Sequence, residues 1–227
     1  MSTAVDTMGL TKGRDAEGSP APDISEKAKP APAKARDMGE VLVPARFDEI
    51  DAVHKMVMDA VRTSPYYCDD FKAYESARLT HGYLAQLLGT DPRHVMTLRE
   101  NGELAGFILS GPEFGVLWQY WSYLDPAHRS GTLAMRVMRH YQTVWQNDRF
   151  HKILTYSRPE NKVSIALMER YGYKRVAELK QHLFGEDYLL YEYPLNKTKP
   201  DYDRGISAGI VAGLRYRLAR MLPFRGR

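Results

Sequence analysis

The spacing of apolar residues predicts alternating strands and helices from residue 40 to residue 196. Apolar positions three or four residues apart predict a helix, and alternating apolar positions predict a strand. The expected strands cover residues 41–43, 94–99, 104–109, 116–124, 152–157, 175–184 and 188–193, and the expected helices cover 47–63, 80–88, 131–146 and 161–170. Gly111-Pro112 is expected to end the strand before it, and residues 63–79 and 110–115 are left as loops.

The order of these elements predicts the fold class. Strands near both ends of the order are joined by short turns such as Asn101-Gly102, whose residues tolerate a positive φ and favour tight hairpins. The central strands are joined by helices, and such crossovers require parallel pairing. We therefore expect an α/β fold of the mixed α+β kind, with a mostly antiparallel central sheet and helices on both of its faces.

Composition limits the classes of function. The chain has 227 residues, of which 44% are hydrophobic and 26% are charged, which is enough for one sizeable core with tails. Its one cysteine, Cys68, excludes an intramolecular disulfide framework and a cysteine-rich zinc site, and this fits a cytoplasmic location. The histidines do not show metal-ligand spacing, so no catalytic metal is expected, and no Gly-x-Ser-x-Gly motif suggests a nucleophilic hydrolase.

Both ends of the chain differ in composition from the expected domain at residues 40–196. Residues 1–39 contain no aromatic residue and are expected to form a disordered tail. Residues 197–227 are expected to form a linker and a basic amphipathic helix. Its apolar residues recur every four positions, at Ile206, Ile210, Leu214, Leu218 and Leu222.

Three states of this C-terminal segment stay open. Residues 205–227 carry basic but no acidic side chains, so they suit peripheral contact with the anionic inner face of a membrane. The apolar stripe equally suits packing on the domain or in a homodimer, and disorder is the third state. Basic and aromatic residues are interleaved only in this short segment, so no nucleic-acid partner is expected.

The segment after residue 124 carries the first candidate binding site. A strand ends at Leu124, Asp125-Pro126 follows, and a helix begins within a stretch of small residues. The first backbone N–H groups of a helix have no partner inside it and lie at the positive end of its dipole, so they attract anions. His128 and Arg129 add positive charge. A phosphate-binding loop and an ordinary strand-to-helix turn both fit these residues.

Residues 161–173 form the second informative segment. Asn161 is a residue type that caps helices through its side chain, and Gly172 is the type that ends them in the left-handed conformation. A capped amphipathic helix accounts for most of this pattern by itself.

The two segments, in this order and at this separation, resemble the GNAT acetyltransferase family. The acyl-CoA loop of that family reads Arg/Gln-x-x-Gly-x-Gly/Ala, and here Arg129 and Ala134 take the first and last positions. Thr132 stands where the first glycine is expected, and Gly131 comes one residue early. In the second family motif, the matching residues are Asn161, Leu167, Glu169, Arg170, Gly172 and Tyr173. The closing hairpin across residues 185–187 also looks like this family.

The resemblance implies a fold and a binding site. The two central parallel strands, ending near Leu124 and Ser157, would splay apart, and the pantetheine arm of an acyl-CoA, with acetyl-CoA expected first, would lie in the gap. The residues implied in acyl-CoA binding are Tyr123, Leu124, Arg129, Ser130, Gly131, Thr132, Leu133, Ala134 and Asn161. The implied activity is transfer of the acyl group to an amine of a small molecule or sugar by direct attack on the thioester.

Catalytic residues are less well marked by the sequence. Family members often place a general-acid tyrosine seven residues after the asparagine, where this chain has Met168. Tyr171, one helical turn further, and Tyr156, on the strand lining the expected cleft, are the candidates that remain. A core position for Tyr171 is the alternative. Candidate bases are the carboxylates near expected strand or loop ends, namely Glu113, Asp125 and Glu160.

An aromatic stretch at residues 118–123 is the last feature of interest. Strict alternation would place Trp118 and Tyr120 on one face of its strand, and Trp121 and Tyr123 on the other. One face is expected to be core, and the other either core or the wall of an acceptor pocket. Because the expected acid is absent, an inactive acyl-CoA-binding scaffold with the same fold is the rival hypothesis. A long-chain N-acyltransferase at the membrane surface is a further alternative.

Overall fold

The computed structural model describes residues 41–129 and 132–203. The helices are α1 (Ile50–Thr63), α2 (Asp69–Arg78), α3 (His81–Thr90), α4 (Leu133–Val144) and α5 (Lys162–Arg170). The strands are β1 (Leu42–Pro44), β2 (Val95–Glu100), β3 (Glu103–Glu113), β4 (Val116–Leu124), β5 (Lys152–Ser157), β6 (Lys174–Leu183) and β7 (Glu186–Pro194). Short 3-10 turns cover Phe47–Glu49, Pro92–His94 and Pro126–His128. The expected tails at 1–39 and 205–227 lie outside the described residues.

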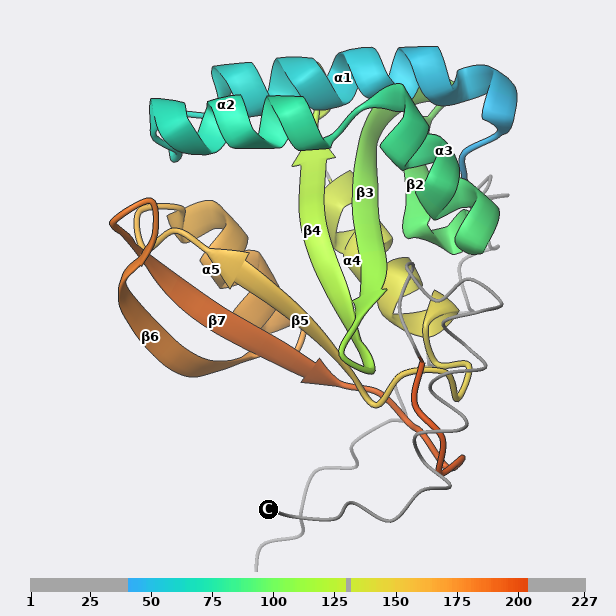
Figure 1. The fold of residues 1–227 in the computed structure, drawn as a ribbon. Coiled ribbons are helices and arrows are strands. Elements are labelled where there is room, and N and C mark those ends of the chain that lie inside the picture. The colour runs from blue at the N-terminus through green and yellow to red at the C-terminus, as the bar shows by residue number, and fades with distance from the viewer. Residues whose placement is uncertain (1–40, 130–131, 204–227) are drawn as a thin grey trace, which may run out of the picture. The chain divides into compact units, whose positions relative to one another are not determined.

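The strands of the described residues form one seven-stranded sheet in the order β1-β2-β3-β4-β5-β7-β6 (Figure 1). Only β4 and β5 pair in parallel, and the other five strand pairs are antiparallel. The expected mixed, mostly antiparallel sheet is therefore confirmed. The helical crossover through α4 between β4 and β5 is what requires the parallel pair.

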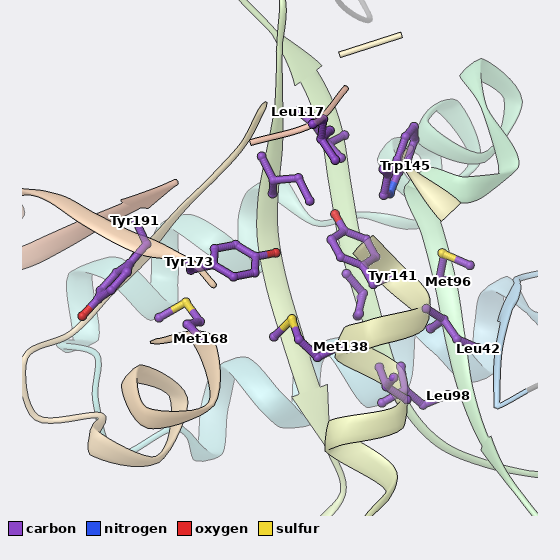
Figure 2. Close-up of a cluster of buried hydrophobic side chains, with 14 of the residues drawn as sticks. Leu42, Met96, Leu98, Leu117, Met138, Tyr141, Trp145, Met168, Tyr173 and Tyr191 are labelled. Carbon is purple, nitrogen blue, oxygen red and sulfur yellow. The ribbon is translucent and has the colours of Figure 1, made fainter. Parts of the chain in front are cut away.

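Two hydrophobic clusters lie on the two faces of the sheet, as alternating strand residues require. Met96 and Leu98 of β2 point into the first cluster, which α4 and α5 cover. Figure 2 shows this cluster, with Tyr141 of α4 and Trp145, the residue that follows α4, among its largest side chains. Val95 of β2 belongs to the second cluster, under α1 and α3. Helices therefore cover both faces, as expected.

Helix α2 was expected to be a loop, and this expectation was wrong. The prediction relied on apolar periodicity, which the sequence of α2 does not show clearly. The only residue that α2 buries is the charged Glu75. The helix instead carries Asp69 and Asp70 in its first turn and Arg78 in its last, which suits the helix dipole. Arg78 also makes a bidentate ion pair with Glu75, at 2.8 Å for both hydrogen bonds.

Strand β3 continues through Gly111-Pro112, where the sequence predicted its end. Pairing between β2 and β3 stops at Val95 and Leu109, so β3 beyond that point has only β4 beside it. Proline is tolerated on such an edge because its missing N–H is not needed by a neighbour. The chain turns later, at Phe114 and Gly115, with φ of 49° and 80°.

The β6–β7 hairpin turns at Phe184 and Gly185, with φ of 52° and 75°, and β7 begins at Glu186. The turn is thus one residue earlier than the expected 185–187. The expected Asn101-Gly102 turn is present, with φ of 54° and 86°.

A β-bulge interrupts β4 at Tyr120. Leu109 of β3 pairs with Trp121, while Ser110 pairs with Gln119, so Tyr120 has no partner on β3. A bulge of this kind shifts the alternation by one residue. Tyr120, Trp121 and Tyr123 consequently all contact the second cluster. The strict alternation expected for this stretch was wrong at Tyr120.

The chain continues along the domain after β7. Leu195 is buried in the first cluster, and the Asn196 N–H donates to the Gln146 side chain at 2.8 Å. Asp148 then accepts hydrogen bonds from Thr198 and Lys199. Nothing in the described part of the chain is a helix long and apolar enough to cross a membrane.

Candidate functional site

β4 and β5 separate after two paired residues. The parallel pairing joins Leu117 to Ile153 and Trp118 to Leu154, and no further pair follows between these two strands. At the next position the Thr155 hydroxyl donates to the Gln119 carbonyl at 2.9 Å, so a side chain replaces the backbone ladder. Figure 1 shows the two arrows diverging from this point. The expected splay of the central parallel strands is confirmed.

Each strand stays with its other neighbour beyond the split. β4 remains paired with β3 as far as Leu124 and Gly106, and β5 remains paired with β7 as far as Ser157 and Leu189. Beyond Trp118, the edge of β4 that faces β5 therefore has no strand partner among the described residues. This stretch leads to Tyr123 and Leu124, the positions whose backbone the family resemblance assigns to the pantetheine arm.

α4 is the next α-helix after β4, and the 3-10 turn Pro126–His128 lies between them. Thr132 is its N-cap residue and makes no side-chain capping hydrogen bond, and the first turn carries no acidic residue. The early N–H groups of the helix, including those of Leu133 and Ala134, have no acceptor within the helix. The Leu133 side chain is buried in the first cluster and fixes the helix on the sheet. Ser130 and Gly131 lie outside the described residues.

Arg129 is held at the end of β4. Its Nε donates to the Leu124 carbonyl at 2.9 Å, and its guanidinium lies 5.8 Å from the centre of the Tyr123 ring. The side chain is otherwise exposed, so its charge remains available to an anion. His128 has a different role, since its Nδ1 lies 2.6 Å from the Glu100 carboxylate on β2.

Asn161 caps α5 as its sequence indicates. Its Oδ1 accepts a hydrogen bond from the Ser164 N–H at 3.2 Å, and the residue follows β5 by a short connection. Because the cap uses the side-chain oxygen, the amide NH2 group is the part that can bind a ligand.

The two candidate catalytic tyrosines lie in different environments. Tyr171 ends α5 and packs against the first cluster, where its carbonyl accepts from Gln142 at 2.7 Å and Arg139 lies 5.9 Å from its ring centre. Met168, in the position of the family's tyrosine, is 3% exposed in the same cluster. Tyr156 lies on β5, with its ring 4.9 Å from that of Trp118 on β4, at the point of separation.

Tyr156 has the surroundings of a proton donor. Its hydroxyl is 3.1 Å from Nε2 of His182. Burial raises the pKa of Tyr156, and the nearby charge of Glu113 raises it further. The side chain is therefore protonated at neutral pH and has an O–H to donate.

An aromatic cluster surrounds Tyr156 on the α2 side of the sheet. It joins rings from β4, β5, β7 and the α2 region, namely Trp118, Trp121, Tyr156, Tyr188, Tyr67 and Phe71. Phe184, at the β6–β7 turn, contacts Phe71 and Tyr74 at ring distances of 6.1 and 5.8 Å. The sequence pointed to the aromatic residues of β4 but placed Trp118 and Trp121 on opposite faces of the strand. It also missed the part of the cluster from α2, for which it offered no periodic signal.

A buried polar network adjoins the aromatic cluster. Glu75 is 4% exposed and accepts hydrogen bonds from Arg78 and from the Trp121 indole at 2.6 Å. Tyr120 donates to Glu113 at 2.7 Å. Burial and the neighbouring Tyr83 and Glu113 hold the pKa of Tyr120 well above its usual value.

The three candidate bases all have partners in the protein. Glu113 accepts from Tyr120, Asp125 accepts from the Ala127 N–H at 2.9 Å, and Glu160 pairs with Arg158 at 3.3 Å. Asp125 is thereby assigned to the turn before α4. The described residues contain no group of three or more His, Cys, Asp or Glu side chains that could hold a metal ion.

A family comparison identifies the chain. The model of the Acetyltransferase (GNAT) family matches residues 56–173, which is more than half of the sequence. The chain belongs to the GNAT acetyltransferase family. The matched range contains both motifs and the β4–β5 separation. No curated protein matches the chain in sequence.

Solved GNAT structures share the fold at low identity. The phosphinothricin acetyltransferase of Sinorhizobium meliloti in complex with acetyl-CoA has 13% identity and a TM-score of 0.57, over 72% of this chain and 92% of that one. The ribosomal-protein-alanine N-acetyltransferase of Brucella melitensis has 19% identity and a TM-score of 0.56, over 68% and 99%. The PaiA N-acetyltransferase of Thermoplasma acidophilum, in complex with coenzyme A, has 9% identity and a TM-score of 0.54, over 67% and 98%. At these identities the likeness shows the GNAT fold.

Proposed function

We propose that the chain is an acyl-CoA-dependent N-acyltransferase that uses acetyl-CoA and acetylates an amine of a small molecule or sugar. The observation that carries this proposal is the separation of β4 and β5 next to the N-terminus of α4. The separation supplies an unpaired strand edge for an amide-containing chain, and the helix supplies N–H groups for a pyrophosphate. Similar structures hold acetyl-CoA or coenzyme A, which supports the same donor here.

The residues near the separation fit such a donor. The backbone of Tyr123 and Leu124 would bind the pantetheine arm, and the amide of Asn161 would bind it from the other side. The N–H groups of Thr132, Leu133 and Ala134, with Ser130 and Gly131 before them, would bind the pyrophosphate. Arg129 is exposed beside this loop and would add a positive charge.

Acetyl-CoA supplies the acetyl group as a thioester. The acceptor amine must arrive unprotonated, because its lone pair forms the new N–C bond as the C–S bond breaks. The proton of the amine passes to solvent or to a base, and the thiolate leaves with the electron pair. Of the two candidate tyrosines, Tyr156 fits the role of donor to this thiolate better, because Tyr171 packs against the first cluster between α4 and α5.

Ligand binding and transfer test this proposal separately. Acetyl-CoA should raise the Tm, since a ligand that binds only the folded state stabilises it by about 2.7 kcal/mol at 100 times its Kd. Transfer is then measured against a panel of amines and amino sugars. Tyr156→Phe should lower kcat by roughly 100-fold or more, which is the usual cost of losing a general acid. Tyr171→Phe should leave kcat within about twofold, because this tyrosine is not the proposed acid. An unchanged Tm at millimolar acetyl-CoA would exclude the proposal.

A catalytically inactive acyl-CoA-binding protein is the second candidate function. The observation that favours it is the burial of Met168, which takes the tyrosine position of the family motif and has no proton to donate. Binding of acetyl-CoA without transfer to any amine in the panel would support this candidate over the enzyme.

A further inference from the structure

Arg158 is a buried cation at the carboxyl end of β5 with one donor group left free. Its side chain is 9% exposed. Nε pairs with Glu160 at 3.3 Å, and Nη2 pairs with Glu186 at 2.5 Å. Nη1 is buried and finds no hydrogen-bond partner among the described residues. A buried N–H group without a partner costs about 1–3 kcal/mol, so such a group in a binding region suggests a ligand.

The surroundings of Arg158 place it at the acceptor side of the proposed reaction. Its guanidinium lies over the Tyr188 ring at 5.2 Å, and Tyr188 contacts Tyr156 and Phe71 in the aromatic cluster. β5 ends at the residue before Arg158, on the same side of the sheet where β4 and β5 separate. A group bound to Nη1 would therefore lie close to the acyl group of a donor held between these strands.

The two glutamates orient the guanidinium without closing the site. They accept hydrogen bonds from Nε and Nη2 and so fix the plane of the guanidinium, which leaves Nη1 as the donor for a ligand. The side chain of Glu160 is 61% exposed and that of Glu186 is 39% exposed, so water screens both charges. The Tyr188 hydroxyl lies beside this guanidinium: burial raises the pKa of Tyr188 to about 12, while a hydrogen bond with Arg158 and the charge of Arg158 act to lower it.

We propose that Arg158 binds the carboxylate of the acceptor through Nη1, so that the acceptor is an amino acid whose side chain lies among the aromatic rings. This inference rests on the proposed N-acyltransferase function and names its substrate class. A carboxylate accepts a charge-assisted hydrogen bond from a guanidinium, which is stronger than one to a neutral group. The exposed rings of Phe184 and Tyr74 form the outer rim of the cluster, and the acceptor would enter past them.

Matched acceptors give the test. The twenty amino acids are compared with their C-terminal amides, which keep the amine and side chain but lack the negative charge. Rates are expressed per unprotonated amine, because the amides have lower amine pKa values. At least one amino acid should be acetylated with a kcat/KM about 10- to 100-fold above that of its amide, the range for one hydrogen bond to a charged group.

Variants assign this preference to Arg158. Arg158→Gln should bring the ratio of acid to amide close to one. Glu186→Gln removes the negative charge beside Arg158 but keeps the guanidinium and its N–H donors, so it should keep the preference for the acid. Arg175→Gln, an exposed arginine on β6, serves as the control for loss of charge. Thermal unfolding of each variant separates a lost contact from a lost fold.

Two results would overturn the inference while acetyl-CoA still raises the Tm. One is that the amides are acetylated as efficiently as the acids, or that no amino acid is acetylated at all. The other is an acid preference that survives in Arg158→Gln. If acetyl-CoA does not bind, the proposed function itself has failed, so the two failures are distinguishable.

Discussion

Glu75 joins the helix that the sequence did not predict to the central strand, so its removal is the sharpest test of the fold. Glu75 is 4% exposed, and its carboxylate accepts two hydrogen bonds from Arg78 and one from the Trp121 indole. Glu75→Ala leaves a partly buried cation without its partner and a buried N–H without an acceptor. Breaking a buried ion pair from one side costs about 3–5 kcal/mol.

The expected loss of stability lies at the lower end of that range. The Arg78 side chain is 24% exposed, so water solvates part of its charge. Its guanidinium also keeps the Tyr83 and Tyr120 rings at 5.3 and 5.1 Å. We expect about 3 kcal/mol for Glu75→Ala. Glu75→Gln keeps an oxygen acceptor for the indole and should cost about 1–2 kcal/mol.

Urea denaturation followed by tryptophan fluorescence measures these changes. Asp59→Ala is the control, because Asp59 pairs with Lys55 on the exposed side of α1 and should change stability by less than about 1 kcal/mol. A loss below about 1 kcal/mol for Glu75→Ala would refute the argument, because burial without compensation would then carry no cost. A substitution of Trp121 by Phe should couple to Glu75→Ala, since both remove the same hydrogen bond.

Three further predictions follow from other parts of the structure. Burial holds the pKa of His94 at about 4, below its usual value, so the unfolded chain binds this proton first as the pH falls. Stability should therefore drop between about pH 6.5 and pH 4, by about 3 kcal/mol from this group, and His94→Phe should flatten the pH dependence seen in urea titrations. Gly106→Ala should cost more than about 2 kcal/mol of stability and weaken acetyl-CoA binding, because the added Cβ would lie 2.2 Å from the Tyr123 carbonyl oxygen. In Gly89→Ala the added Cβ meets nothing within 4 Å, so this control should stabilise α3 by up to about 1 kcal/mol. Co-sedimentation with liposomes containing anionic lipid, measured with and without residues 204–227, separates the three states of the C-terminal segment: loss of binding on deletion would support membrane contact, and equal partitioning would exclude a membrane anchor.

Local signals explain the parts of the fold that the sequence predicted well. The aromatic-rich stretch at β4 and the alternating stretch at β5 gave both strands with their observed bounds. Asn161 caps α5, and Gly172 follows that helix with a φ of 84°, as their residue types indicated. Each of these features depends on residues within a few positions of one another, so a single sequence is enough to reveal it.

Helix α2 could not be predicted in the same way. Its buried residue is charged, and one of the two partners that make burial of Glu75 tolerable is Trp121, 46 residues further along the chain. Nothing in the local pattern around Glu75 shows that an indole N–H will meet it. From apolar periodicity alone, Glu75 is expected to be exposed to solvent. Only its contacts in the folded structure show that it is buried.

The bulge at Tyr120 helps explain why the sequence predicted the proposed acyl-CoA side of the site better than the proposed acceptor side. By adding one residue to β4, it turns Tyr120 and Trp121 to the α2 face, while Gln119 stays on the other face and accepts from Tyr173 at 3.1 Å. The same added residue bends the strand next to the point where β4 leaves β5. The proposed donor side depends on backbone groups and a helix N-terminus, which a family motif can encode. The proposed acceptor side depends on Arg158 and on aromatic rings from separate elements, which come together only in the folded structure.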